Sequence, residues 1–459
     1  MLFSSITFIY YFLPILLIVY FLAPSKYKNL VLLIFSLIFY FLGEPKYILI
    51  LILSCLVNYY LGKLIPSSKH PKLILTTAIL YNVIQLLIFK YTDFFIDNIN
   101  NVLSLNIPFM YIVMPIGISF FTFQTLGYVI DVYLKKHEPA PSLIDFMTYV
   151  CLFPQLVAGP IVRYIDVEND LKYRKNTYGD FSNGVKRFTI GLSKKVLIAN
   201  VLGEFVNAIT TATVLSSWLK PIAFTLQIYF DFSGYSDMAI GLGLMFGFKF
   251  KENFNYPFIA DSITDFWRRW HISLSSWFRD YIYIPLGGNR VNKLKWFRNI
   301  FAVWFLTGFW HGASWNFIIW GLYFFVILIV EKLFLGKYLK RTKILKYIYT
   351  LMIVIISFLI FSVNSTNEIL EGLKNMFFIN NIPIFNHEII YQIKNYISIF
   401  IIAITASTPL MKIIVNKLGT TPLKKLINIL EPIYYILLLI LTTAFLIDAS
   451  FNPFLYFRF

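Results

Sequence analysis

Two of the five histidines lie among apolar and aromatic residues, where an imidazole could serve as a general base. His311 lies within the window Leu306–Asn316, which reads Leu-Thr-Gly-Phe-Trp-His-Gly-Ala-Ser-Trp-Asn. Removal from water favours the neutral imidazole, the form that accepts a proton near neutral pH. Gly308 and Gly312 would let a slim substrate approach the backbone. The alternative is a core histidine bonded to a neighbouring carbonyl, and this window alone leaves both interpretations open.

His271 lies among tryptophans and arginines, in the window Asp265–Arg279. Tryptophan together with arginine is typical of a helix at a membrane surface, so His271 is either a reactive residue or an interfacial one without chemistry. Four arginines in or near this window could hold the phosphates of a cytosolic donor: Arg268, Arg269, Arg279 and Arg290. Anionic lipid would require the same charges, and the sequence does not separate the two ligands.

Two carboxylates, Asp231 and Asp237, interrupt an apolar segment. They are six positions apart and do not share one helical face well, so we do not expect a paired acid–base site. Buried carboxylates are usually hydrogen-bonded or ion-paired, and we expect structural hydrogen bonds or a pairing with Arg268 or Arg269. Substrate binding is the functional interpretation of both aspartates.

The elements that position these residues are predicted to be membrane helices. Apolar residues make up 58% of the chain and charged residues 14%, whereas soluble domains contain about 45–50% and about 25%. A bilayer can solvate such a surface, so we predict an all-α polytopic membrane protein. The regular candidate spans are 6–23, 29–42, 46–62, 72–90, 109–134, 299–332, 344–363, 389–415 and 432–450.

The middle of the chain is less regular. Segments 143–165, 181–212 and 219–248 are apolar but contain Pro, Gly and polar residues, and 299–332 is too long for one untilted span, which predicts a break near Trp310–Ser314. Irregular backbone at membrane depth must be buried in protein or line a cavity, so we expect the functional core within 143–315.

We treat residues 1–459 as a single membrane domain, because we find no repeat of fixed period and no linker. It would consist of N-terminal helices over 1–140, a catalytic core over 141–335, C-terminal helices over 336–450 and a tail over 451–459. The first apolar run lacks a basic region and a small-residue cleavage site, and we expect it to be retained as a span.

The net charge of +17 is explained by the positive-inside rule, which keeps Lys and Arg in cytoplasmic loops. The alternation of basic and non-basic loops places both termini outside the cytoplasm. Nucleic-acid binders share the charge but not the hydrophobicity, so no nucleic-acid partner is expected. The two cysteines form no zinc-binding pattern, and there is no His-Glu-x-x-His motif, so no metal is expected. The sequence also contains no Walker A loop and no Gly-x-Ser-x-Gly elbow, so neither ATP hydrolysis nor a soluble-type serine hydrolase is expected.

Six stretches resemble, in order, bacterial membrane-bound O-acyltransferases of the alginate O-acetyltransferase (AlgI-like) and peptidoglycan O-acetyltransferase (PatA-like) group. They are Phe153–Tyr164, Phe230–Gly243, Glu252–Pro257, Phe266–Ser275, Arg279–Arg290 and Trp310–Trp315. The resemblance implies a ring of tilted transmembrane helices, some broken or re-entrant, around a thin catalytic core. Funnels from both faces would meet near the histidine.

The resemblance also assigns roles. His311 matches the family's essential histidine, His271 matches a second important histidine, and Trp310 becomes a candidate substrate-binding residue. The donor is expected to be acetyl-CoA or another acyl thioester, with no bound cofactor. The acceptor would be a polysaccharide outside the bacterial cytoplasmic membrane, reached with the help of an SGNH-hydrolase-like partner.

The C-terminal segment Pro453–Phe459 resembles a terminal motif of this branch whose tyrosine is thought to carry the acyl group briefly. In the related teichoic-acid D-alanylation system, a small separate protein supplies a similar tail. Tyr456 would then accept acetyl as an ester near His311 and pass it to the partner. The alternative is an aromatic anchor at the membrane interface.

The expected function is transfer of an acetyl group across the membrane for O-acetylation of a peptidoglycan, alginate-like or cellulose-like polymer. The alternatives are D-alanyl transfer to teichoic acid, acylation of a lipid, and transport without chemistry. A transporter predicts internal repeat symmetry, which this sequence lacks.

Overall fold

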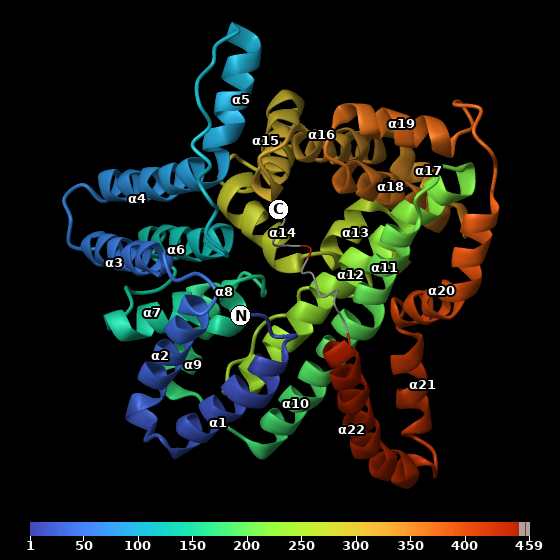
Figure 1. The fold of residues 1–459 in the computed structure, drawn as a ribbon. Coiled ribbons are helices and arrows are strands. Elements are labelled where there is room, and N and C mark those ends of the chain that lie inside the picture. The colour runs from blue at the N-terminus through green and yellow to red at the C-terminus, as the bar shows by residue number, and fades with distance from the viewer. Residues whose placement is uncertain (449–454, 456–459) are drawn as a thin grey trace. The chain divides into compact units, whose positions relative to one another are not determined.

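Every regular element that the structure describes is a helix (Figure 1). The structure is a computed structural model of the full chain, and it describes residues 1–448 and Leu455. Within that part, five helices are long and apolar enough to cross a membrane: Pro71–Leu103, Trp315–Leu339, Leu345–Ser362, His387–Ala406 and Lys424–Asp448. Two shorter apolar helices cover Phe8–Leu22 and Ile48–Leu64. The prediction of an all-α polytopic membrane protein is therefore confirmed.

The chain separates into two compact units, and the single-domain assignment stays a prediction. Unit 1 contains residues 1–188 and 238–251. Its helices are η1 (Phe8–Phe12), α1 (Leu13–Leu22), η2 (Ser25–Tyr27), α2 (Lys28–Phe41), α3 (Ile48–Leu64), α4 (Pro71–Leu86), η3 (Leu87–Tyr91), α5 (Thr92–Leu103), α6 (Ile118–Tyr133), α7 (Leu143–Cys151), α8 (Phe153–Leu156), α9 (Tyr164–Tyr173) and most of α10 (Tyr178–Ser193).

Helices α3, α4 and α6 of unit 1 pack together through buried polar side chains as well as apolar ones (Figure 1). The amides of Asn58 and Asn82 hydrogen-bond each other over 2.7 and 3.3 Å, and the Thr125 hydroxyl donates to Asn82 over 3.0 Å. Such bonds hold helices together where lipid offers no polar partner. Helix α6 begins only at Ile118, after Gly117 with φ 77°, so the predicted span 109–134 is wrong in its first part.

Unit 2 contains residues 189–237 and 252–459. Its helices are η4 (Lys194–Asn200), α11 (Val201–Ala208), most of α12 (Val214–Met245), η5 (Pro257–Ile259), α13 (Ile263–Arg269), α14 (Ile272–Phe278), η6 (Arg279–Tyr283), α15 (Lys293–His311), α16 (Trp315–Val330), η7 (Glu331–Leu335), α17 (Gly336–Leu339), α18 (Leu345–Ser362), α19 (Thr366–Met376), α20 (His387–Ala406), α21 (Leu410–Leu418) and α22 (Lys424–Asp448).

Two predicted spans of unit 2 are interrupted. Helix α15 ends at His311 and α16 begins at Trp315, which confirms the break predicted within 299–332. The segment 389–415 was predicted as one span, and this is wrong. Helix α20 ends at Ala406, and Pro409 stands immediately before α21, where its ring and missing N–H prevent the preceding helix from continuing.

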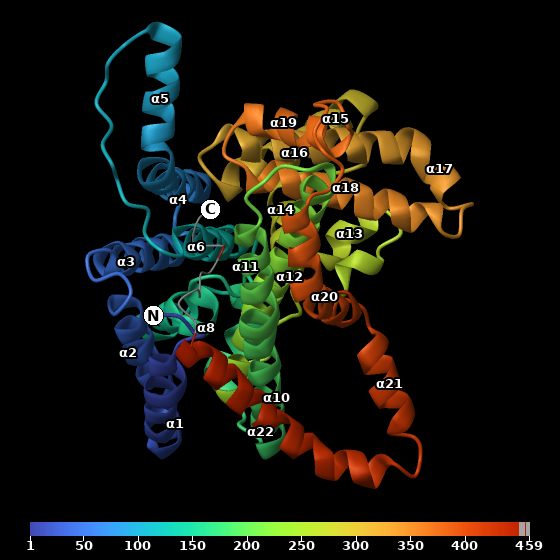
Figure 2. The same cartoon turned by 45° about the vertical axis from the view of Figure 1, so that its right-hand side comes forward.

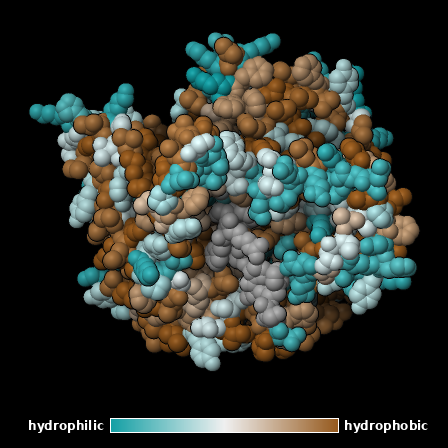
Figure 3. All heavy atoms as spheres, turned by 45° about the horizontal axis from the view of Figure 1, so that its top comes forward, coloured by the Kyte–Doolittle hydropathy of each residue, from teal (hydrophilic) through white to brown (hydrophobic). Residues whose placement is uncertain are grey.

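The last helix exposes its apolar side chains. Only 6% of the most apolar window of α22 is buried, and α22 follows α21 through a short turn (Figure 2). Its exposed residues include Leu426, Ile429, Leu430, Ile433, Leu437, Ile440 and Phe445. Apolar side chains cover much of the face seen in Figure 3. Hydrocarbon is the solvent that suits such a surface.

Candidate active site

His311 is the last residue of α15, and aromatic rings of unit 2 surround it. Its ring centroid lies 5.0 Å from Trp310, 4.9 Å from Trp320 and 5.3 Å from Phe361, with interplanar angles of 74°, 82° and 83°. These are edge-to-face contacts, the favoured arrangement for packed aromatic rings. His311 is 6% exposed. The imidazole therefore sits in a largely dry aromatic pocket, as its sequence window predicted.

Close contact between α15 and α16 (Figure 1) places this ring. A Cβ atom at Gly308 would lie 2.4 Å from the Phe317 carbonyl oxygen, and one at Gly321 would lie 2.4 Å from the Trp304 carbonyl oxygen. A Cβ at Gly312 would lie 2.3 Å from the Phe317 ring. The space at Gly308 and Gly312 is thus filled by α16, and the expectation that a substrate uses it is wrong.

His271 also lies near Trp310. Its ring centroid is 6.1 Å from that of Trp310 and 4.7 Å from that of Phe232. The residue is 1% exposed and precedes the first turn of α14 in a left-handed conformation, with φ 44° and ψ 55°. The structure therefore brings together His271, Trp310 and His311, three residues singled out from the sequence.

Asn253 orients His271, although its position in the sequence had not suggested such a role. Asn253 is fully buried, and its Oδ1 accepts hydrogen bonds from the Ser273 N–H over 3.1 Å and the Ser273 hydroxyl over 2.8 Å. The same oxygen lies 3.2 Å from His271 Nδ1. The available signal was its place in the stretch Glu252–Pro257, which belongs to the family resemblance.

The tautomer of His271 follows from these contacts. Because Asn253 Oδ1 accepts from a backbone N–H, it is an oxygen, and His271 Nδ1 must carry the proton that it shares with that oxygen. His271 lies outside the helices long enough to span a membrane. Burial lowers the pKa of His271 from 6.5 to about 3. The ring is thus neutral at physiological pH and offers Nε2 as an acceptor.

The four candidate arginines differ from the histidines in exposure. Arg268, Arg279 and Arg290 are exposed, and Arg269 is partly buried. Arg269 Nε lies 2.8 Å from Asp265 Oδ2, and Arg279 Nε lies 2.6 Å from Asp280 Oδ1. These cations lie at the surface of unit 2, where they can meet phosphates, whereas the imidazoles are buried.

The two carboxylates of α12 are engaged by consecutive lysines of η4. Asp231 Oδ1 lies 2.6 Å from Lys195 Nζ, and Asp237 Oδ2 lies 2.7 Å from Lys194 Nζ. Of the two expectations for these carboxylates, structural hydrogen bonding is confirmed. The pairing with Arg268 or Arg269 is wrong, because Lys195 pairs with Asp231 and Arg269 pairs with Asp265 of its own helix. A substrate-binding role of Asp231 and Asp237 stays a prediction.

Asp231 has a second partner in the C-terminal segment. Its Oδ2 accepts a hydrogen bond from the Leu455 backbone N–H over 2.8 Å. Tyr456, the predicted acyl carrier, lies outside the described residues.

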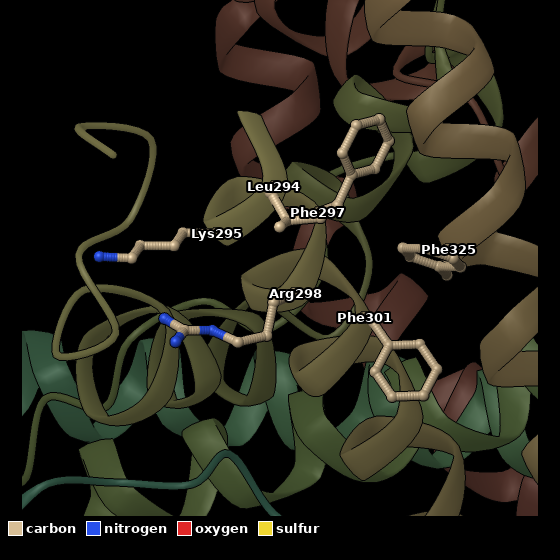
Figure 4. Close-up of a pocket in the computed structure, with 6 residues that line it drawn as sticks. All are labelled: Leu294, Lys295, Phe297, Arg298, Phe301 and Phe325. Carbon is tan, nitrogen blue, oxygen red and sulfur yellow. The ribbon is translucent and has the colours of Figure 1, made fainter. Parts of the chain in front are cut away.

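Residues of α15 and α16 line a cavity of about 500 Å³ (Figure 4). It is lined by Leu294, Lys295, Phe297, Arg298, Phe301 and Phe325. Its lining includes neither histidine, and the Arg298 guanidinium donates to the Leu286 carbonyl and to Asn299 Oδ1. We therefore place the candidate chemistry at His271, Trp310 and His311 and not in this cavity. Within the described residues, no group of three His, Cys, Asp or Glu side chains could hold a metal ion.

A family model and several known proteins match more than half of this chain. A family model described as the membrane-bound O-acyltransferase family matches residues 37–369. The chain is 41% identical over 373 residues to a probable alginate O-acetylase of Azotobacter vinelandii, with 79% of this chain and 75% of that protein covered.

Two further relatives are named for different activities. The chain is 36% identical over 427 residues to a peptidoglycan O-acetyltransferase of Helicobacter pylori, covering 84% of this chain and 81% of that protein. It is 34% identical over 274 residues to a teichoic acid D-alanyltransferase of Bacillus subtilis, covering 54% and 68%. Both buried histidines lie within the range that the family model matches.

Proposed function

Because the chain belongs to the membrane-bound O-acyltransferase family, we propose that this membrane enzyme transfers acetyl groups from a cytosolic thioester to an extracytoplasmic polysaccharide. The observation that carries the proposal is the buried arrangement of His271, Trp310 and His311 within unit 2. The relatives named for alginate and peptidoglycan acetylation support acetyl as the group transferred, since each aligns with more of the chain than the D-alanyltransferase does.

His311 is the proposed general base. Its neutral imidazole takes the proton of an attacking hydroxyl group, and the hydroxyl oxygen bonds to the thioester carbonyl carbon. The carbon–sulfur bond then breaks, and the proton passes from the imidazolium to the departing thiolate. The products are an acetyl ester and a free thiol. Trp310, Trp320 and Phe361 exclude water that would hydrolyse the ester.

His271 has a different proposed role, because its protonated Nδ1 faces Asn253. Its Nε2 accepts a hydrogen bond, for which an amide N–H in the arm of acetyl-CoA is a suitable donor. The exposed arginines Arg268, Arg279 and Arg290 suit the phosphates of that donor, with Arg269 beside them in sequence. His271 thus holds the thioester while His311 moves the proton.

Delivery of the acetyl group to the polymer would take two steps. The hydroxyl that attacks is that of Tyr456, and an SGNH-hydrolase-like partner then moves the acetyl group to the polymer. Both termini lie outside the cytoplasmic membrane, as the distribution of basic loops supports. In this proposal the donor approaches from the cytosol and the acceptor lies on the outer side of the membrane.

Mass spectrometry of cell-wall and secreted glycans tests the function. We expect His311→Ala to abolish acetyl esters while the protein still inserts and accumulates, and His70→Ala, which removes an exposed histidine, to leave them unchanged. Normal acetylation in accumulated His311→Ala would refute the assignment. The same spectra address the second candidate, which the Bacillus subtilis relative favours: loss of D-alanyl esters in place of acetyl esters would establish D-alanyl transfer.

A further inference from the structure

Leu455, the one residue after Asp448 that the structure describes, lies in the buried core of unit 2. Leu455 is 6% exposed and belongs to the same buried apolar cluster as Trp320 and Phe361, the rings that contact His311. Its backbone N–H donates to Asp231 Oδ2 over 2.8 Å, across a sequence separation of 224 residues. Leu455 is therefore hydrogen-bonded to the middle of helix α12.

Asp231 is held from its other side by Lys195. The two side chains are 2% and 3% exposed, and Asp231 Oδ1 lies 2.6 Å from Lys195 Nζ. One carboxylate oxygen thus meets a cation, and the other meets the peptide N–H of Leu455. A buried ion pair persists only where hydrogen bonds satisfy its remaining lone pairs. The C-terminal peptide supplies one of these bonds.

The helices that carry the pair touch each other through backbone atoms. A Cβ atom at Gly234, one turn after Asp231, would lie 2.7 Å from the Gly191 carbonyl oxygen and 3.2 Å from the Lys195 backbone nitrogen. The π-helical turn η4 presents Lys194 and Lys195 in succession to the two carboxylates of α12. The acceptor for Leu455 is therefore fixed to a rigid contact between two helices, as a precise positioning device requires.

We propose that Lys195 and Asp231 form a latch that docks the C-terminal segment of this same chain, and that they are positioning residues for Tyr456. The inference rests on the proposed function, because that proposal makes Tyr456 the acyl acceptor. Tyr456 is the next residue after Leu455. A hydrogen bond to one backbone N–H selects a position along the segment and not a type of side chain, so the latch sets the register of the tail.

Two substitutions at Leu455 test the latch directly. Leu455→Pro removes the backbone N–H that Asp231 accepts, whereas Leu455→Ala keeps it and shortens only the side chain. We expect deuterium exchange in peptides of residues 449–459 to be about tenfold faster in Leu455→Pro than in Leu455→Ala, as loss of a hydrogen bond to a carboxylate implies. The kcat for acetyl transfer should fall by a similar factor, with the KM for acetyl-CoA unchanged. Equal exchange in the two variants would overturn the latch.

Two neutral double variants test it from the other partner. Lys195→Met with Asp231→Leu removes both charges and the acceptor, and apolar replacement of a buried ion pair is commonly tolerated. Lys195→Gln with Asp231→Asn also removes the charges but keeps an amide oxygen for Leu455. We expect fast tail exchange in the first variant and near-parental exchange in the second. Parental exchange in the first variant would contradict the latch, and if that variant does not accumulate, the Leu455 pair decides.

These readouts separate the latch from the function on which it rests. Full activity of Tyr456→Phe would refute the carrier role, yet the exchange difference between Leu455→Pro and Leu455→Ala would still establish docking by Asp231. Inactive Tyr456→Phe together with unaltered exchange in Leu455→Pro would support the carrier and refute the latch.

Discussion

At His271 the backbone adopts a conformation that costs a non-glycine residue roughly 1–2 kcal/mol. The φ of 44° is maintained by Asn253, whose carbonyl oxygen accepts from Ile272 N–H over 2.9 Å and whose side chain accepts twice from Ser273. A residue with a strained backbone conformation at a buried site indicates function when the surrounding hydrogen bonds hold it in that conformation. Asn253 therefore positions His271, as packing against α16 positions His311.

Asn253→Ala should reveal this support. The substitution leaves the partly buried Ser273 N–H without its Asn253 acceptor and removes the oxygen beside His271 Nδ1, at a cost of about 1–3 kcal/mol in the free energy of unfolding. We expect a lower Tm in detergent and slower acetyl transfer. Asn255→Ala, at an exposed position two residues later, is the control and should match the parent. Parental Tm and activity for Asn253→Ala would show that the orientation of His271 has another source.

Only some residues of the candidate site could be predicted from the sequence. His311 and His271 were recognisable because each imidazole stands in an apolar or aromatic window, where a polar group requires a reason. The partner of Asp231 was not recognisable, because the π-turn of η4 decides which lysine faces α12. Asn253 was missed since a buried asparagine in a loop has no periodicity to mark it.

At the scale of helices, the hairpin of α15 and α16 determines the site. Its break after His311 was predictable, since 299–332 exceeds the length of one span and contains Gly, Ser and polar residues at its centre. The contact between Gly308 and Gly321 was not, because glycine in a sequence does not say whether a substrate or a helix fills its space. Here a helix does.

Gly308→Ala and Gly321→Ala should each be destabilising, although alanine favours a helix by up to about 1 kcal/mol over glycine. The added methyl group would overlap backbone atoms at 2.4 Å, and overpacking costs about 1–3 kcal/mol. Gly372→Ala in α19 is the matched control, because its methyl group would meet only side-chain atoms of Leu359 at 3.1 Å or more. Thermal unfolding and acetyl transfer measure the difference. Gly308→Ala with parental stability and activity would contradict the account of helix packing.

At the scale of the molecule, sequence predicted the class of fold far better than individual boundaries. Composition alone indicated membrane helices, because no soluble core could hold 48 Phe and 31 Tyr in 459 residues with so few charges. The ends of α6 and α20 were misplaced because hydropathy does not register where Gly117 and Pro409 interrupt a helix. The orientation of the chain in the membrane is inferred only from the distribution of Lys and Arg among the loops, and it stays a prediction.

Cysteine labelling tests that orientation. Cys55 and Cys151 are fully buried, so the parent chain should react little with a membrane-impermeant maleimide. We expect a cysteine at Asn106, in an exposed loop without basic residues, to react in intact cells, and one at exposed Lys343 to react only after permeabilisation. The reverse pattern would place both termini in the cytoplasm and remove the route proposed for the acetyl group.

If His311 activates a hydroxyl group for attack on a thioester, the acetyl ester that forms should be detectable by covalent labelling. Purified protein would be incubated with radiolabelled acetyl-CoA, digested, and its C-terminal peptide analysed for label that alkali releases. We predict ester-linked label on that peptide in the parent, and none in His311→Ala or in Tyr456→Phe. Label on the C-terminal peptide of His311→Ala at the parental rate would contradict the account.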